Sequence, residues 1–146
     1  MDHQAVARIL LAVFCGLQGA GTVAIDMNRT HATHPHWPGH ARFHVVWQTA
    51  TVTALSLLEI ALLLVRGPFE AQRVYLAVIL AGLPMLGFFI ALVLRRIYGG
   101  TLSDPGGMPP LTVAVRGMQF RVDLNGVVEA VGVALLAALV ALYRSR

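Results

Sequence analysis

Four long apolar stretches alternate with short polar segments along the chain. They cover residues 5–25, 45–65, 74–94 and 122–143. A run of about 20 apolar residues is long enough to cross a hydrocarbon core of about 30 Å as a helix. The pattern predicts an all-α fold, an integral membrane four-helix bundle with helices at about residues 5–25, 40–65, 72–96 and 121–143. Because the connections are short, we expect a single transmembrane domain, residues 1–146.

The composition supports a multi-pass protein of a cell membrane or an inner membrane. Hydrophobic residues make up 57% of the chain and charged residues 12%, whereas soluble domains carry roughly 25% charged residues. All basic residues are arginines near the ends of the predicted helices, which suits interfacial anchoring and not nucleic-acid binding. The expected partners are the lipid bilayer and a hydrophobic small molecule, and a homo-oligomer is compatible with the pattern. The single cysteine, Cys15, excludes an intrachain disulfide, and we interpret it as a small buried residue.

Two of the predicted helices carry polar positions at helical spacing. At about 100° per residue, Cys15, Gly19, Thr22 and Asp26 share one face of the first helix. The second helix has a longer set that falls within about 100° of rotation, and we expect this polar stripe to descend from the interface into the bundle. Its members are His40, His44, Gln48, Thr51, Leu55 and Glu59, with Phe43 and Trp47 beside it.

The segments between the helices differ in character. Five of the six histidines fall between His31 and His44, and Pro35 and Pro38 make the first part of this stretch a loop. We expect His34 and His36 in that loop to be solvated or interfacial. Pro84 predicts a kink in the third helix, and the following segment "YGGTLSDPGGMPPLT" predicts an irregular cover on the same side as the histidine loop.

Polar residues from the first, second and fourth helices are expected to converge on one membrane side. Arg121, Asn125 and Glu129 are spaced by four and share a face of the predicted fourth helix. A charged group at membrane depth costs about 2.5–3.5 kcal/mol, so such residues normally face a bundle interior. The predicted catalytic residues are Asp26, His31, His40, His44 and Glu129, and the predicted substrate-binding residues are Asn28, Trp37, Trp47, Gln48, Arg121 and Asn125.

Three functions fit this set of residues. The first is acid-base chemistry without a cofactor, such as isomerisation, cyclisation or epoxide opening of a lipophilic small molecule, in which histidine and carboxyl groups transfer protons. The second is a metal-dependent oxidoreductase or hydrolase whose transition metal is held by His40 and His44, since histidines at i and i+4 can bind one ion. The third is a non-catalytic ligand-binding or proton-coupled membrane protein, in which Glu59 would belong to a proton path.

The stretch "DMNRTHATHPHWPGHARFHVVWQ" resembles an uncharacterised family of small four-helix membrane proteins. The signature of that family runs Asp-x-Asn-x-Thr-His, Pro-x-Trp-Pro and His-Ala-Arg-Phe-His. It matches Asp26, Asn28, Thr30, His31, Pro35, Trp37, Pro38, His40, Ala41, Arg42, Phe43 and His44. The resemblance implies a functional segment here and no particular reaction. The architecture is also similar to sterol isomerases of the emopamil-binding type, and the Arg121, Asn125 and Glu129 pattern to small membrane glutathione transferases. Both similarities concern fold class alone.

Overall fold

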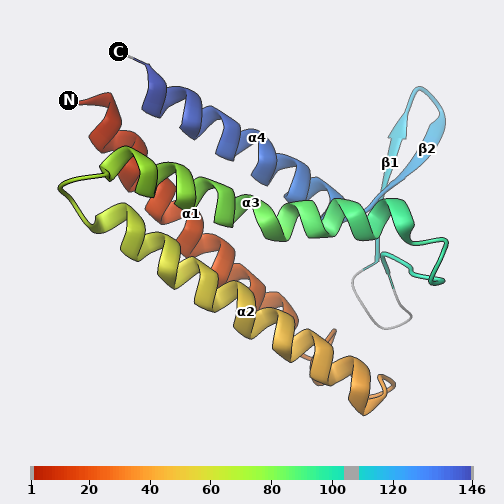
Figure 1. The fold of residues 1–146 in the computed structure, drawn as a ribbon. Coiled ribbons are helices and arrows are strands. Elements are labelled where there is room, and N and C mark those ends of the chain that lie inside the picture. Colours follow the sequence, from red (N-terminus) through yellow and green to blue (C-terminus); the bar gives the residue numbers. More distant parts are fainter. Residues whose placement is uncertain (1, 104–108, 146) are drawn as a thin grey trace.

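The fold is a bundle of four long helices with one small hairpin. The computed structural model describes residues 2–103 and 109–145. The elements are α1 (His3–Asp26), α2 (Gly39–Leu64), α3 (Glu70–Leu94), β1 (Leu111–Val115), β2 (Met118–Val122) and α4 (Leu124–Arg144), as Figure 1 shows. Each helix is long and apolar enough to cross a membrane. The predicted helical bundle is confirmed, and the ends of its first three helices lie within two residues of the prediction.

The segment before α4 differs from the prediction, because β1 and β2 form an antiparallel hairpin where an irregular cover was expected. Arg116 and Gly117 connect the strands, and both have positive φ, 50° and 81°. Two such residues give the two-residue turn whose twist matches that of paired strands. Arg121 consequently belongs to β2 and not to the fourth helix. Part of the expected cover, residues 104–108, lies outside the described residues.

The helix α4 starts three residues later than predicted because Asp123 is its N-cap. The Asp123 carboxylate accepts hydrogen bonds from the backbone N–H groups of Asn125 and Gly126, at 2.9 and 3.4 Å. An aspartate in this position satisfies donors that have no partner inside the helix. The cap therefore separates the strand that carries Arg121 from the helix that carries Asn125 and Glu129.

Small residues bring α1 and α2 into close contact. A Cβ atom placed on Gly19 would lie 2.8 Å from the Ser56 Oγ atom, and one on Gly16 would lie 3.7 Å from Ile60. Helices in lipid gain stability from such close packing. The predicted face of α1 that bears Cys15 and Gly19 is therefore the face that contacts α2.

The polar stripe predicted on α2 does not face the bundle along its whole length. His40, His44 and Gln48 are exposed, whereas Glu59 is buried. The reason is helical phase, because the buried positions of α2 are centred about 140° of rotation from His40. Glu59, at about 100°, lies at the edge of that buried face, whereas His40 and His44 lie outside it. The buried positions of α2 are instead Thr49, Val52, Ser56, Glu59 and Leu63.

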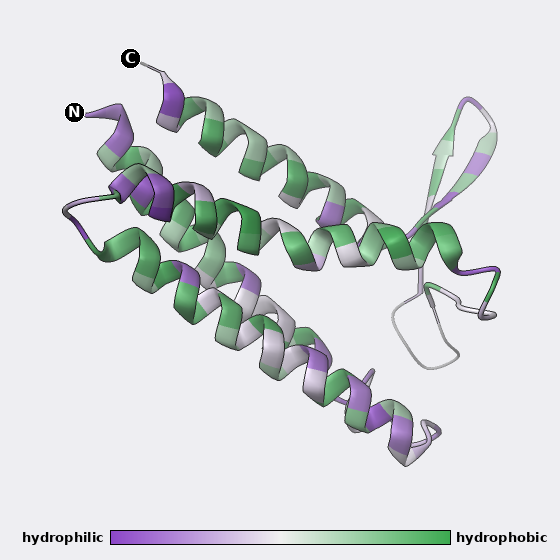
Figure 2. Ribbon diagram, in the orientation of Figure 1, coloured by the Kyte–Doolittle hydropathy of each residue, from purple (hydrophilic) through white to green (hydrophobic). Residues whose placement is uncertain are grey.

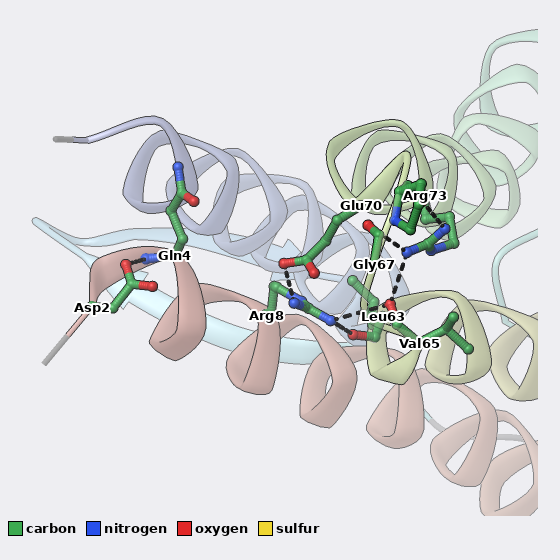
Figure 3. A network of polar contacts seen from close by, with 9 residues as sticks. Asp2, Gln4, Arg8, Leu63, Val65, Gly67, Glu70 and Arg73 are labelled. Atoms are coloured by element: carbon green, nitrogen blue, oxygen red, sulfur yellow. Dashed lines mark hydrogen bonds and ion pairs between the residues drawn. The ribbon is translucent and has the colours of Figure 1, made fainter.

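An arginine of α1 closes the C-terminal end of α2 (Figure 3). Arg8 is 6% exposed. Its guanidinium donates to the Leu63 carbonyl through Nε at 3.2 Å and through Nη2, and its Nη1 pairs with Glu70 of α3. Arg73 of α3 donates to the Val65 carbonyl at 3.2 Å on the same connection. Carbonyls at a helix end have no partner inside the helix. These arginines donate the missing hydrogen bonds at the C-terminal end of α2 and thereby join it to α1 and α3.

The helix α3 changes direction near its middle (Figure 1), and Pro84 lies inside this helix. A proline in a helix interior removes one hydrogen bond and displaces the carbonyl four residues earlier. Gln18 of α1 donates to the neighbouring Ala81 carbonyl at 3.1 Å. The carbonyl that Pro84 leaves without a helical partner is that of Leu80, so the Gln18 contact lies one residue from it and joins α1 to α3 next to the predicted kink.

The packed core occupies the half of the bundle that contains both termini. His3 Nδ1 lies 3.2 Å from Ser145 Oγ at this end, while at the other end α2 and α4 are well separated (Figure 1). Hydrophilic residues gather at the helix ends and along the first half of α2 (Figure 2). The buried core consists of Ala7, Leu11, Cys15, Leu63, Val74, Ala77, Ala81, Met85, Leu136 and Tyr143.

We predict that Gly19→Ala destabilises the protein by about 1–3 kcal/mol, because the added methyl group overpacks the contact with Ser56. Gly21→Ala is the matched control, since nothing lies within 4 Å of a Cβ there, and alanine gains up to about 1 kcal/mol over glycine in a helix. The free energy of unfolding of both variants is measured by titration with SDS in mixed detergent micelles. Equal effects of the two substitutions would contradict the close approach, and Ser56→Gly is expected to rescue Gly19→Ala.

We also predict that Arg8→Met lowers the free energy of unfolding by about 2–3 kcal/mol, because it leaves the Leu63 carbonyl and Glu70 without their partner. The control is Arg66→Met at the same end of the bundle, where the arginine is exposed. A change within about 0.5 kcal/mol is expected there. The same SDS titration distinguishes them, and a loss of equal size in both variants would argue against the capping role of Arg8.

Candidate functional site

The candidate site is built at the C-terminal end of α1 and the loop that follows it. Asp26 is the last residue of α1, and its backbone carbonyl accepts a hydrogen bond from the Ala32 N–H at 2.9 Å. Its half-buried carboxyl group lies 3.4 Å from the Thr49 hydroxyl of α2. The hydroxyl has one proton, and the Val45 carbonyl at 2.8 Å is its closer acceptor. Thr49 Oγ1 therefore keeps lone pairs that can accept from Asp26 when that carboxyl group is protonated.

Asn28 and Thr30 hold His31 in a defined orientation. The Asn28 Oδ1 atom accepts from the Thr30 backbone N–H at 2.8 Å and from the Thr30 hydroxyl at 2.6 Å. The Asn28 amide nitrogen donates to the Ala24 carbonyl at 2.9 Å. Since a backbone N–H can only donate, these contacts fix which end of the amide is oxygen.

The hydrogen bonds also fix the tautomer of neutral His31. Its Nδ1 atom lies 2.8 Å from the Thr30 hydroxyl, whose own proton is used toward Asn28. Thr30 Oγ1 must accept here, so His31 Nδ1 carries the proton. The Nε2 atom is then the basic nitrogen, and it has no hydrogen-bond partner among residues 2–103 and 109–145. This arrangement prepares His31 to receive a proton.

Aromatic rings and an acidic group surround the His31 imidazole. Trp37 contacts it edge to face, with ring centroids 5.5 Å apart. The Asp26 carboxyl group lies within electrostatic range of this ring. Of the predicted site residues, the structure brings Asp26, Asn28, His31 and Trp37 together, and it adds Thr30 and Thr49.

His34 is buried inside the loop, whereas it was expected to be solvated or interfacial. It is 3% exposed, its Nδ1 accepts from the His36 backbone N–H at 3.2 Å, and its carbonyl accepts from Arg42 at 2.8 Å. The turn at Pro35 folds the ring inward against Trp37, at a centroid distance of 5.7 Å. His36 is exposed, as predicted.

The other two predicted histidines form a separate pair on the outer face of α2. His40 and His44 are exposed, and their Nε2 atoms lie 3.1 Å apart. Trp47 stacks beside His44 at a centroid distance of 5.8 Å. No group of three or more His, Cys, Asp or Glu side chains within the described part of the chain is arranged to hold a metal ion.

The predicted residues from the other half of the bundle do not join either group. Arg121 is exposed on β2, while Asn125 and Glu129 are half-buried on α4. The start of α4 is well separated from the start of α2 in Figure 1. The predicted convergence required the four helices to stay packed along their whole length. The described core instead extends no further than Cys15 in α1 and Leu136 in α4, so the start of α4 is not held against the end of α1.

A buried polar contact that was not predicted lies deeper between α1 and α2. Glu59 is 1% exposed and lies beside Cys15. Its Oε2 atom and the Ser56 Oγ atom have no hydrogen-bond partner in the described structure. Ser56 and Thr49 were not predicted because the inward face of α2 was assigned from the positions of the histidines. Assigning that face from the small residues that contact α1 would have identified both.

A shallow apolar hollow of about 330 Å³ lies elsewhere, on α3, lined by Phe89, Ile90, Val93 and Leu94. It contains none of the predicted site residues. Comparisons with protein-family models, with curated proteins and with solved structures give no match.

Proposed function

We propose that the protein is a multi-pass integral membrane enzyme of a cell or inner membrane that performs acid-base chemistry on a lipophilic small molecule. Asp26 and His31 are its proton-transfer pair. The observation that carries the proposal is the hydrogen-bond chain from Asn28 through Thr30 to His31 Nδ1, which leaves Nε2 as a base. Four helices long and apolar enough to cross a membrane support a substrate that arrives from lipid.

The chemistry needs one acid and one base that act on the same substrate molecule. In a double-bond shift, protonated Asp26 gives its proton to one alkene carbon, and His31 Nε2 removes a proton from the carbon attached to the other alkene carbon, so the double bond moves by one position. One C–H bond forms and one breaks, and return of the proton from His31 to Asp26 restores both groups. In epoxide opening the same acid protonates the oxygen while His31 takes a proton from the attacking water. General acid-base catalysis of this kind contributes typically 10²- to 10⁴-fold.

The remaining predicted residues have no step in this mechanism. His40, His44, Trp47 and Gln48 are on the exposed face of α2. Arg121, Asn125 and Glu129 belong to the hairpin and α4. Asn28 acts as a positioning residue, and Trp37 supplies an aromatic wall beside the imidazole.

Isotope incorporation tests the proposal without knowledge of the substrate. Purified protein in lipid nanodiscs is incubated with a total lipid extract of its native membrane in D₂O or in H₂¹⁸O. We expect a lipophilic compound to gain deuterium, or ¹⁸O for epoxide opening, only when the protein is present. Mass spectrometry measures the gain, and Asp26→Asn or His31→Gln should reduce its rate by about 10²-fold or more.

The matched controls are Asp123→Asn, which retains a good N-cap on α4, and His36→Gln at the exposed loop histidine. Both should keep the full rate. Incorporation that survives Asp26→Asn and His31→Gln would place the reaction elsewhere. If no compound gains an isotope, the non-catalytic function replaces this one.

A second candidate function is a metal-dependent hydrolase or oxidoreductase centred on His40 and His44. The supporting observation is the 3.1 Å separation of the two Nε2 atoms. Two imidazoles bound to one tetrahedral Zn²⁺ at about 2.0–2.1 Å have nitrogens roughly 3.3 Å apart, so a small rotation suffices. The exposed pair would leave positions for water or substrate, as catalytic sites require.

Calorimetric titration of tag-free protein with Zn²⁺ or Ni²⁺ tests this second candidate. We expect binding of one equivalent that weakens by about tenfold or more in His40→Ala and in His44→Ala, which corresponds to about 1.4 kcal/mol. His36→Ala is the control at a nearby exposed histidine and should bind as the wild type does. Binding that is unaffected by the first two substitutions, or absent throughout, would exclude the pair as a metal site.

A further inference from the structure

The hairpin of β1 and β2 has one apolar and one polar face. Its register pairs Val113 with Phe120 and Thr112 with Arg121. Directly opposite residues lie on the same side of a two-stranded sheet, and successive residues alternate between sides. One face therefore carries only apolar side chains, those of Leu111, Val113, Val115, Met118, Phe120 and Val122, and the other carries Thr112, Ala114, Gln119 and Arg121.

The described part of the chain leaves the apolar face largely uncovered. Phe120 is 47% exposed and Met118 is 59% exposed. An isolated two-stranded hairpin is at best marginally stable in water and needs its apolar face packed against something. The sharp division into two faces indicates a boundary between an apolar and an aqueous phase.

The position of the hairpin identifies that boundary. Strand β2 ends at Val122, and α4, which is long and apolar enough to cross a membrane, begins at Leu124. The hairpin extends to the side of α4 and does not continue its axis (Figure 1). Figure 2 shows both hydrophilic and hydrophobic segments in it. A sheet that leaves a membrane helix sideways at its end lies along the membrane surface.

Charge complementarity supports the same location. Arg121 is on the polar face and Arg116 is in the turn, while Arg95 and Arg96 follow α3 at the same end of the bundle. Arginines at this level attract anionic lipid headgroups, at about 1 kcal/mol per residue near the surface. No acidic residue is present in the hairpin, residues 111–122.

We propose that this hairpin is an interfacial lipid-binding element, whose apolar face inserts among the upper acyl chains and whose arginines contact lipid headgroups. The depth is limited by the outer edges of both strands, whose backbone N–H and C=O groups pair with no further strand in the described part of the chain. Such edges are not tolerated in the hydrocarbon core but can be hydrated at headgroup level. The inference rests on the membrane location proposed above and is independent of the proposed reaction.

Site-specific fluorescence quenching tests the orientation. In a Cys15→Ala background, an environment-sensitive fluorophore is attached at Phe120→Cys or Val113→Cys on the apolar face. The matched controls are Arg121→Cys and Thr112→Cys, the cross-strand pair on the polar face. The protein is placed in vesicles of phosphatidylcholine with phosphatidylglycerol, and quenching is compared between iodide in water and lipids with a nitroxide on the upper acyl chain.

We expect several-fold stronger lipid quenching and weaker iodide quenching at Phe120→Cys and Val113→Cys than at the control pair. Equal iodide access on both faces would overturn the proposal. So would an apolar face shielded from both quenchers, which would instead indicate a protein contact. A fluorophore at Ile79→Cys, on the exposed surface of α3, tests the membrane location itself. Lipid quenching at Ile79→Cys without lipid quenching at the hairpin would refute the insertion of the hairpin alone. No lipid quenching at Ile79→Cys would refute the proposal that the helices span the membrane.

Discussion

Arg8 supplies the interaction on which the arrangement of the helices depends. It is an almost fully buried guanidinium that satisfies the Leu63 carbonyl at the end of α2 and pairs with Glu70 at the start of α3. A buried cation is tolerated only when paired and hydrogen-bonded. Its position therefore fixes the depth of α1 against the other two helices. The buried core around Leu11, Leu63 and Val74 forms at this same end, which leaves the opposite end free to carry polar groups.

The candidate site uses that opposite end and is built mainly from local contacts. Asn28, Thr30 and His31 are close in sequence, and their hydrogen bonds determine which imidazole nitrogen carries the proton. Thr49 is the contribution from the neighbouring helix. The site thus needs the α1–α2 contact at Gly19 and Ser56, but it does not need α4. The structure explains the Asp-x-Asn-x-Thr-His spacing, because Asp26, Asn28, Thr30 and His31 each make different hydrogen bonds.

Periodicity and length were sufficient to predict the four helices, the kink at Pro84 and the grouping of Asp26 with His31, since each follows from local sequence. Three features could not be predicted in this way. The burial of His34 depends on how the loop turns at Pro35. The hairpin depends on positive φ angles at Arg116 and Gly117, hidden in a segment rich in glycine and proline. The separation of Glu129 from the histidines depends on where the packed core ends. The spacing of residues along each helix does not determine this, because it depends on how the helices pack against one another.

The tautomer of His31 decides whether Nε2 can act as the base of the proposed reaction. Protein with ¹⁵N-labelled histidine in nanodiscs, at about pH 8 where an ordinary histidine is neutral, gives long-range ¹H–¹⁵N correlations that distinguish the two ring nitrogens. His31→Gln assigns the signal, and Thr30→Val removes the acceptor of Nδ1–H. We expect the Nδ1-protonated tautomer in the wild type and its loss in Thr30→Val. An Nε2-protonated His31 in the wild type would contradict this expectation.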